Sequence, residues 1–132
     1  MHLSPHLTFR GECETAFRFY EQTFGGTIIT RVTYGESPQA RETPPHWHDK
    51  IVHASLTVGG QLLNGVDLQP EQYEPPRGFY VLLGVDYPER AERIFNALAE
   101  NGVVRMPLQQ TFWAKRFGVV VDRFGIPWEI NC

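Results

Sequence analysis

The spacing of hydrophobic residues along the chain changes from that of a strand to that of a helix and back. Residues 3–9 alternate apolar and polar positions, which is typical of a half-buried strand. Apolar residues then recur at helical spacing, and Gly25-Gly26 supplies a helix stop: Ala16, Phe17, Tyr20, Phe24. Residues 27–34 are rich in β-branched side chains, and residues 50–67 indicate two strands joined at Gly59-Gly60. The pattern predicts a strand, a helix, a strand and a hairpin.

The same order returns in the second half. A strand is expected over residues 78–85, and Asn101-Gly102 ends a helix whose apolar face recurs at i, i+3, i+4 and i+7: Ala91, Ile94, Phe95, Leu98. Residues 111–131 indicate two aromatic-rich strands joined at 122–125. The expected fold class is therefore α+β in a single domain, with one βαβββ module over 1–67, a linker over 68–77 and a second βαβββ module over 78–132.

Composition narrows the classes of partner. The formal net charge is −3 and the basic residues are scattered among acidic ones, so no basic surface argues for nucleic acid or an anionic membrane. No run of eighteen apolar residues and no signal-peptide pattern occurs, which favours a cytoplasmic protein with small-molecule partners. Cys13 and Cys132 belong to no Cys-x-x-Cys pair and are expected to be reduced thiols.

Strand alternation predicts which polar side chains lie on the face that the helices leave open. In the strand over 51–58, the apolar set Val52, Ala54, Leu56 and Val58 is expected to face the helix, which leaves His53, Ser55 and Thr57 on the other face. His6 in the first strand and Glu129 in the last fall on the open face by the same argument. Two imidazoles and a carboxylate are a standard ligand set for zinc or iron. The alternative is two hydrogen-bonded strand histidines and a solvated glutamate.

Other candidate motifs are weaker. His46 and His48 share a face only if their segment is extended, and the flanking prolines favour a surface loop or lid. The glycines of the first hairpin precede no helix, so they are interpreted as turn residues and not as a phosphate-binding loop. No nucleophile motif is present.

Several sequence blocks resemble the vicinal oxygen chelate superfamily, and within it the PhnB-like branch of glyoxalase and bleomycin-resistance proteins. The resemblance covers nearly the whole chain: residues 5–9, 11–20, 53–56, 106–113 and 117–128. It implies a cupped mixed sheet with helices on the outer face, a ligand cavity inside the cup, and a homodimer.

The resemblance also implies site positions. Glu129 falls where the C-terminal carboxylate ligand of the metal enzymes lies, and His53 or Ser55 falls near the ligand on the first hairpin. In the first strand the family register selects Pro5, whereas alternation selects His6. Phe79 occupies the equivalent position of the second module and cannot ligate, so three ligands at most remain.

Two functional hypotheses follow. The first is a small-molecule-binding protein whose cup is lined by Phe79, Phe112 and Trp113, with Arg116 pairing with the ligand. The second is an enzyme of the lyase, isomerase or dioxygenase type that uses Zn, Ni, Fe or Mn held by His53, Glu129 and His6 to polarise an oxygen-rich substrate. Because Phe79 replaces a ligand, the binding protein is favoured. The reaction and the ligand are not assigned by the sequence.

Overall fold

The computed structural model describes all of residues 1–132 as two compact units, Met1–Glu74 and Pro75–Cys132. Each unit contains one helix and one four-stranded mixed sheet, which confirms the α+β class with two similar modules. The division lies within the segment 68–77 that was expected to be a linker. No helix has both the length and the apolar character needed to cross a membrane.

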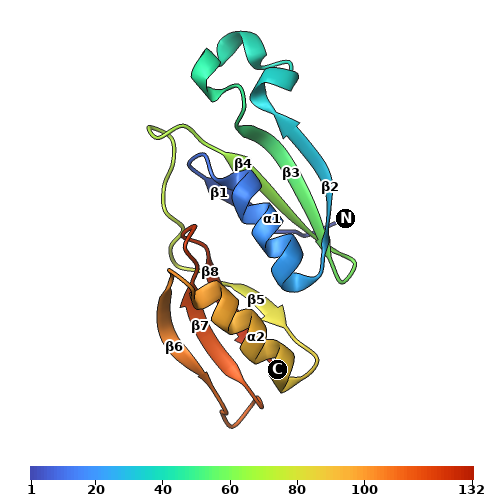
Figure 1. Cartoon of the computed structure of the whole chain (residues 1–132), viewed down its shortest axis with the longest axis vertical. Coiled ribbons are helices and arrows are strands. Elements are labelled where there is room, and N and C mark those ends of the chain that lie inside the picture. The colour runs from blue at the N-terminus through green and yellow to red at the C-terminus, as the bar shows by residue number, and fades with distance from the viewer. The chain divides into compact units, whose positions relative to one another are not determined.

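The sheet of the first unit has the order β1-β4-β3-β2, and helix α1 (Cys13–Phe24) lies along one of its faces (Figure 1). Its strands are β1 (His6–Phe9), β2 (Thr27–Thr33), β3 (Ile51–Val58) and β4 (Gln61–Asp67). β1 pairs with β4 in parallel, and the other neighbours are antiparallel. Three 3-10 helices occupy the connection from β2 to β3: Tyr34–Glu36, Ala40–Glu42 and Pro45–Trp47.

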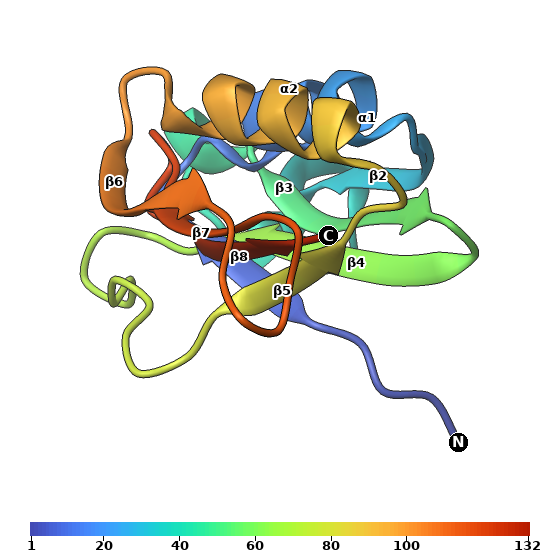
Figure 2. The ribbon, with the colours of Figure 1, turned by 90° about the horizontal axis from the view of Figure 1, so that it is seen from below.

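The second unit repeats this plan with the sheet order β5-β8-β7-β6 and helix α2 (Pro88–Ala99). Its strands are β5 (Val81–Gly84), β6 (Val103–Gln109), β7 (Phe117–Val121) and β8 (Pro127–Asn131). Figure 2 shows α2 on one side of these strands. One sheet face in each unit is therefore covered by a helix, and the other is free of helices.

Apolar side chains fill the space between each helix and its sheet. Phe9 and Phe17 meet edge to face with ring centroids 6.1 Å apart, and Tyr20 stacks on Phe24 at 5.5 Å. Tyr20 is fully buried, and Phe95 in the second unit is 5% exposed. Both helical faces predicted from the sequence are confirmed.

The structure corrects three local expectations. The strand expected over 78–85 is only Val81–Gly84, and the first strand of the last hairpin begins at Phe117, with residues 111–116 forming a loop before it. In β3, Ile51 is buried and Val52 is half-buried, which reverses the expected order. The cause is a register shift between β2 and β3, located between the pairs that Val32 and Thr33 form with β3. One extra residue of β3 is inserted there, so the inward and outward positions before it are exchanged.

A buried carboxylate connects three parts of the first unit. One oxygen of Asp67, at the end of β4, accepts the backbone N–H groups of Gly11 and Cys13, both at 2.9 Å. The other oxygen accepts the N–H of Ile51, also at 2.9 Å. Asp67 is 1% exposed, so these bonds compensate a carboxylate that water does not reach.

A second buried carboxylate, that of Asp122, stabilises the turn at residues 122–125, between the last two strands. Asp122 accepts the N–H groups of Phe124 and Ile126 at 2.8 and 3.0 Å and the indole N–H of Trp128 at 2.9 Å. Gly125 supplies the positive φ of 89° that the turn requires. The turn of the aromatic-rich hairpin predicted over residues 111–131 therefore has a structural role.

We expect Asp67→Asn to reduce the free energy of unfolding by about 3 kcal/mol, because an amide nitrogen replaces one acceptor and leaves a buried N–H unpaired. Urea denaturation measures the loss. Asp86→Asn is the control, since Asp86 has a side chain 63% exposed in an ion pair with Arg90, and should cost below about 0.5 kcal/mol. Equal losses in the two variants would contradict the role given to Asp67.

Candidate functional site

A row of polar side chains crosses the helix-free face of the first sheet. In register, His6 lies beside Asn64, Asn64 beside Ser55, and Ser55 beside Thr30. The opposite face carries Leu7, Phe9, Ala54 and Leu56 against α1, all of them buried. The open-face side chains thus alternate with core residues along the strands, as the sequence pattern predicts for His6 and Ser55.

Hydrogen bonds join four of the side chains on this face. The hydroxyl of Ser55 donates to Oδ1 of Asn64 at 2.7 Å, and Nδ2 of Asn64 donates to Oγ of Ser4 at 3.0 Å. Oγ of Ser55 also lies 3.3 Å from Nε2 of His53. Ser55 is 4% exposed, whereas His53 is exposed. We call this chain of Ser4, Asn64, Ser55 and His53 the polar relay.

Asn64 and Ser4 were not among the residues predicted from the sequence. Asn64 lies between two buried positions of β4, Leu63 and Gly65. A polar amide at such a position is the sequence feature that could have identified Asn64 as a site residue. Its partner could not be identified from alternation alone, because that requires the register between β4 and β3.

On the helix-free face of the second sheet, Glu129 lies between Leu82 of β5 and Val119 of β7 in register. Glu129 is half-buried and Leu82 is 58% exposed. Trp128 and Ile130, on either side of it in β8, are buried. This placement agrees with the alternation from which Glu129 was chosen.

The aromatic candidates of the second unit are exposed. Phe79 is half-exposed just before β5, and Phe112 and Trp113 lie in the loop between β6 and β7. The Trp113 ring makes edge contacts with Phe112 at 4.6 Å and Phe117 at 5.4 Å. Arg116 has a protein partner, since its Nε donates to Glu92 of α2 at 3.1 Å.

The metal hypothesis depends on side chains from both units. His6 lies two strands from Ser55, a separation of about 10 Å by the usual strand spacing. The structure brings no three His, Cys, Asp or Glu side chains together as a possible metal site. Imidazole and carboxylate donors suit zinc or iron chemically, and their convergence with Glu129 stays a prediction. His48 is engaged elsewhere, with Nε2 2.8 Å from the carbonyl of Thr43.

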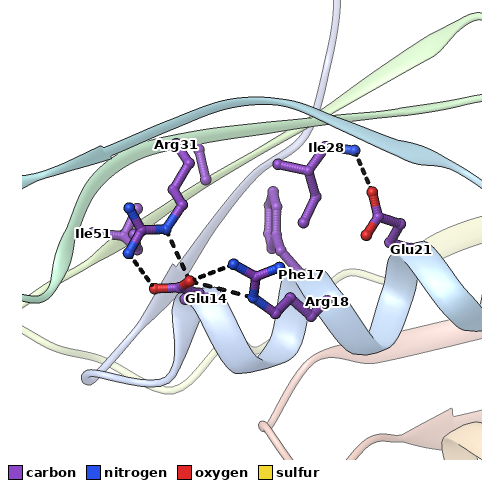
Figure 3. Close-up of a pocket in the computed structure, with 8 residues that line it drawn as sticks. Glu14, Phe17, Arg18, Glu21, Ile28, Arg31 and Ile51 are labelled. Atoms are coloured by element: carbon purple, nitrogen blue, oxygen red, sulfur yellow. Dashed lines mark hydrogen bonds and ion pairs between the residues drawn. The ribbon is translucent and has the colours of Figure 1, made fainter.

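Two cavities of the first unit lie beside α1 instead. One, of about 250 Å³, has Phe17, Ile28, Ile51 and Ala54 among its lining residues and the charged side chains Glu14, Arg18, Glu21 and Arg31 (Figure 3). The other, of about 320 Å³, shares Glu14, Arg18 and Ile51 and adds Asp49, Lys50 and Asp67. None of the candidate site residues predicted from the sequence lines either cavity.

An ion-pair cluster lies at the first of these cavities. Figure 3 shows Glu14 between two guanidinium groups: Arg31 contacts both of its oxygens at 2.8 Å, and Arg18 donates at 2.8 Å. The hydrogen bonds from Arg31, assisted by Arg18, lower the pKa of Glu14 from 4.5 to about 2. One carboxylate thus contacts two guanidinium groups, and the cluster acts as a structural clamp between α1 and β2.

Burial affects two further groups. Desolvation, with the nearby carboxylates of Asp67 and Glu14, raises the pKa of the fully buried Cys13 thiol far above its ordinary value. Desolvation likewise raises the pKa of Tyr34, whose hydroxyl donates to the carbonyl of Asp67 at 2.6 Å. Neither group has the lowered pKa of an activated nucleophile or base.

We expect Glu14→Gln to lower stability by about 1 kcal/mol or less at neutral pH, because Glu14 is partly exposed. The pKa is depressed in the folded state, so the stabilisation is present above pH 4.5 and is lost as pH falls through about 2. Urea denaturation at neutral and acid pH measures it. Glu89→Gln is the matched control, since Glu89 is the second residue of α2 and makes no ion pair. A loss independent of pH would contradict the clamp.

Proteins with similar sequences and structures match nearly the whole length of this chain. Residues 1–131 match the family described as 3-demethylubiquinone-9 3-methyltransferase. Protein YjdN of Escherichia coli (strain K12) is 35% identical over 99% of this chain and 95% of YjdN. The crystal structure of protein PA1353 from Pseudomonas aeruginosa is 46% identical, with a TM-score of 0.91 over 100% of this chain and 97% of that one.

More distant structures share the fold. A putative 3-demethylubiquinone-9 3-methyltransferase, PhnB protein, from Bacillus cereus has a TM-score of 0.80 at 24% identity, over 99% of this chain and 98% of that one. A glyoxalase/bleomycin resistance protein/dioxygenase family enzyme from Burkholderia phytofirmans has a TM-score of 0.66 at 17% identity, with the same shares covered. The resemblance found in the sequence is confirmed: the chain shares the fold of a PhnB protein and of a glyoxalase/bleomycin resistance protein/dioxygenase family enzyme, and it belongs to the 3-demethylubiquinone-9 3-methyltransferase family.

Proposed function

We propose that this protein binds a small organic molecule on the helix-free face of its sheets and that the polar relay is the part of the site that recognises the ligand. The polar relay itself is the observation that carries the proposal. A serine hydroxyl and an asparagine amide lie among buried strand positions on a face that no helix covers. Polar groups in such a place are costly unless every one is paired, and here they end at an exposed imidazole.

The composition of the two faces supports this assignment. On the helix side, charged groups such as Glu14 and Asp67 are already paired by arginines or backbone amides. On the open side, His53 has one ring nitrogen near Ser55 and no partner for the other. Exposed Phe79 and Trp113 of the second unit offer apolar surface of the kind that binds a flat organic ligand. A small molecule with a polar edge matches the polar relay of the first unit.

The family description names a methyltransferase, and the turn before α1 favours ligand binding over that activity. A nucleotide-like methyl donor is usually held by free backbone amides at a glycine-rich turn between a strand and a helix. Here the amides of Gly11 and Cys13 donate to the carboxylate of Asp67. These two amides are therefore not free to bind a cofactor.

A divalent-metal enzyme is the second candidate, because the resemblance of the sequence implies ligand positions at His53 and Glu129. With His6 they would supply two imidazoles and one carboxylate, and the ion would polarise substrate oxygens. The aromatic Phe79, at the fourth family position, supports the metal-free alternative.

We expect small aromatic and hydroxylated acids that bind this protein to shift the backbone amide resonances of His53, Ser55 and Asn64. A fragment screen by amide correlation spectra measures the shifts. His53→Ala should weaken binding of each hit at least about tenfold, the loss of one good hydrogen bond. His2→Ala, at an exposed residue near the start of the chain, should leave affinity unchanged.

Two outcomes would redirect the assignment. Shifts confined to Glu14, Arg18 and Arg31 would place binding in the cavity beside α1 and contradict the proposed site. Stoichiometric zinc, nickel, iron or manganese that is lost in His53→Ala, and that binds more weakly at acid pH because protons compete for imidazole, would establish a metal site and favour the second candidate instead.

We further propose a homodimer, since one-sided sheets of this family are commonly completed by a second copy. Sedimentation at micromolar concentration should give twice the chain mass of 15.1 kDa. A single species at the chain mass, unchanged when the concentration is raised, would contradict the dimer.

A further inference from the structure

The hydroxyl of Ser55 has two partners but only one proton. It lies 2.7 Å from Oδ1 of Asn64 and 3.3 Å from Nε2 of His53. A serine donates one hydrogen bond and accepts others, so it can donate to only one of these atoms. The direction of the polar relay therefore decides where the proton of the neutral His53 ring resides.

The distances select one direction. A separation of 2.7 Å is typical of an O–H to oxygen bond, which identifies the atom of Asn64 facing Ser55 as its carbonyl oxygen. The 3.0 Å separation between Asn64 and Ser4 is typical of an N–H to oxygen bond, as expected for the amide nitrogen of the same side chain. Both distances would fit less well if the amide were turned over, with its nitrogen toward Ser55. The proton of Ser55 is thus used on Asn64.

It follows that Oγ of Ser55 accepts from His53, and that Nε2 of His53 carries a proton. In a neutral imidazole the other nitrogen then holds a lone pair. Nδ1 of His53 has no partner in the protein, and the side chain is exposed. The relay also tolerates the imidazolium, since Nε2 donates in both protonation states.

We infer that Asn64, acting through Ser55, is a positioning residue that holds the neutral ring of His53 as the Nε2–H tautomer and thereby makes Nδ1 the atom that contacts the ligand. The role of Nδ1 rests on the proposed binding function, whereas the tautomer does not. A lone pair at Nδ1 accepts a hydrogen bond, so the ligand carries a hydroxyl or ammonium group at this point.

The tautomer is measured by two-bond ¹H–¹⁵N correlation spectra of ¹⁵N-histidine-labelled protein at about pH 8.5, where an ordinary imidazole is neutral. His53→Ala assigns the signals. In the wild type, Nε2 should resonate as the protonated nitrogen. In Asn64→Ala the proton of Ser55 is released and can donate to Nε2, so the two nitrogens should exchange their resonance positions and the Nδ1–H form should predominate.

Asn64→Asp is the matched variant, because its carboxylate still accepts from Ser55 and should preserve the Nε2–H form. Aspartate keeps the size and shape of asparagine, so Asn64→Asp retains the packing as well as the acceptor, and the thermal unfolding midpoint of each variant shows whether it is folded. An Nδ1–H ring in the wild type, or an unchanged ring in a folded Asn64→Ala variant, would overturn the inference.

Alkylation tests the availability of Nδ1 without any knowledge of the ligand. Iodoacetamide attacks an unprotonated ring nitrogen, and the exposed His2 serves as the internal control for the reagent. His53 should be modified at Nδ1 in the wild type and predominantly at Nε2 in Asn64→Ala. Modification of the wild type at Nε2, or a His53 that stays unmodified while His2 reacts, would overturn the role given to Nδ1. A failed ligand screen would leave both of these results standing, so the two proposals can fail separately.

Discussion

The two carboxylate oxygens of Asp67 bind the turn before α1 and the start of β3 to the end of β4. A charge without solvent is tolerable only when all of these N–H groups surround it, so the three segments are stable together and not singly. The hydrogen bonds to Asp67 thus hold the start of β3, which follows the long connection from β2, beside the end of β4. The register that follows places Ser55 beside Asn64 on the opposite face. The polar relay thus depends on a carboxylate that it does not touch.

The two faces of the first sheet use different electrostatics. Beside α1, the carboxylate of Glu14 contacts two guanidinium groups, and that of Asp67 accepts several backbone amides. On the open face the polar relay contains no carboxylate, lysine or arginine, and what matters is the direction in which each hydrogen bond points. A neutral relay can offer either a donor or an acceptor at its end, depending on how its amide is oriented. Recognition by this face is therefore set by hydrogen-bond polarity more than by charge.

The sequence predicted those features that depend on residue period. Alternation assigned the faces of His6, Ser55 and Glu129, and helical spacing identified the buried faces of α1 and α2. It misplaced Ile51 and Val52, since a register shift adds a residue that no local pattern reveals. Asn64 was missed because its role depends on which strand lies next to β4. A common site for His53 and Glu129 stays a prediction, because strand period does not determine the packing between modules.

In each unit, an aromatic side chain of the helix packs against a glycine in a strand. A Cβ at Gly65 would lie 2.7 Å from the Phe17 ring, and one at Gly118 would lie 2.7 Å from the Phe95 ring. A larger residue at either position requires the aromatic ring or its surroundings to move. Directly after Asn64, therefore, comes a position at which substitution disturbs the packing, while Asn64 itself has its side chain on the other face. Descendants of this chain can change what the open face recognises by point substitution without altering the contacts that fold the unit. Such a separation lets new specificities evolve on an unchanged scaffold.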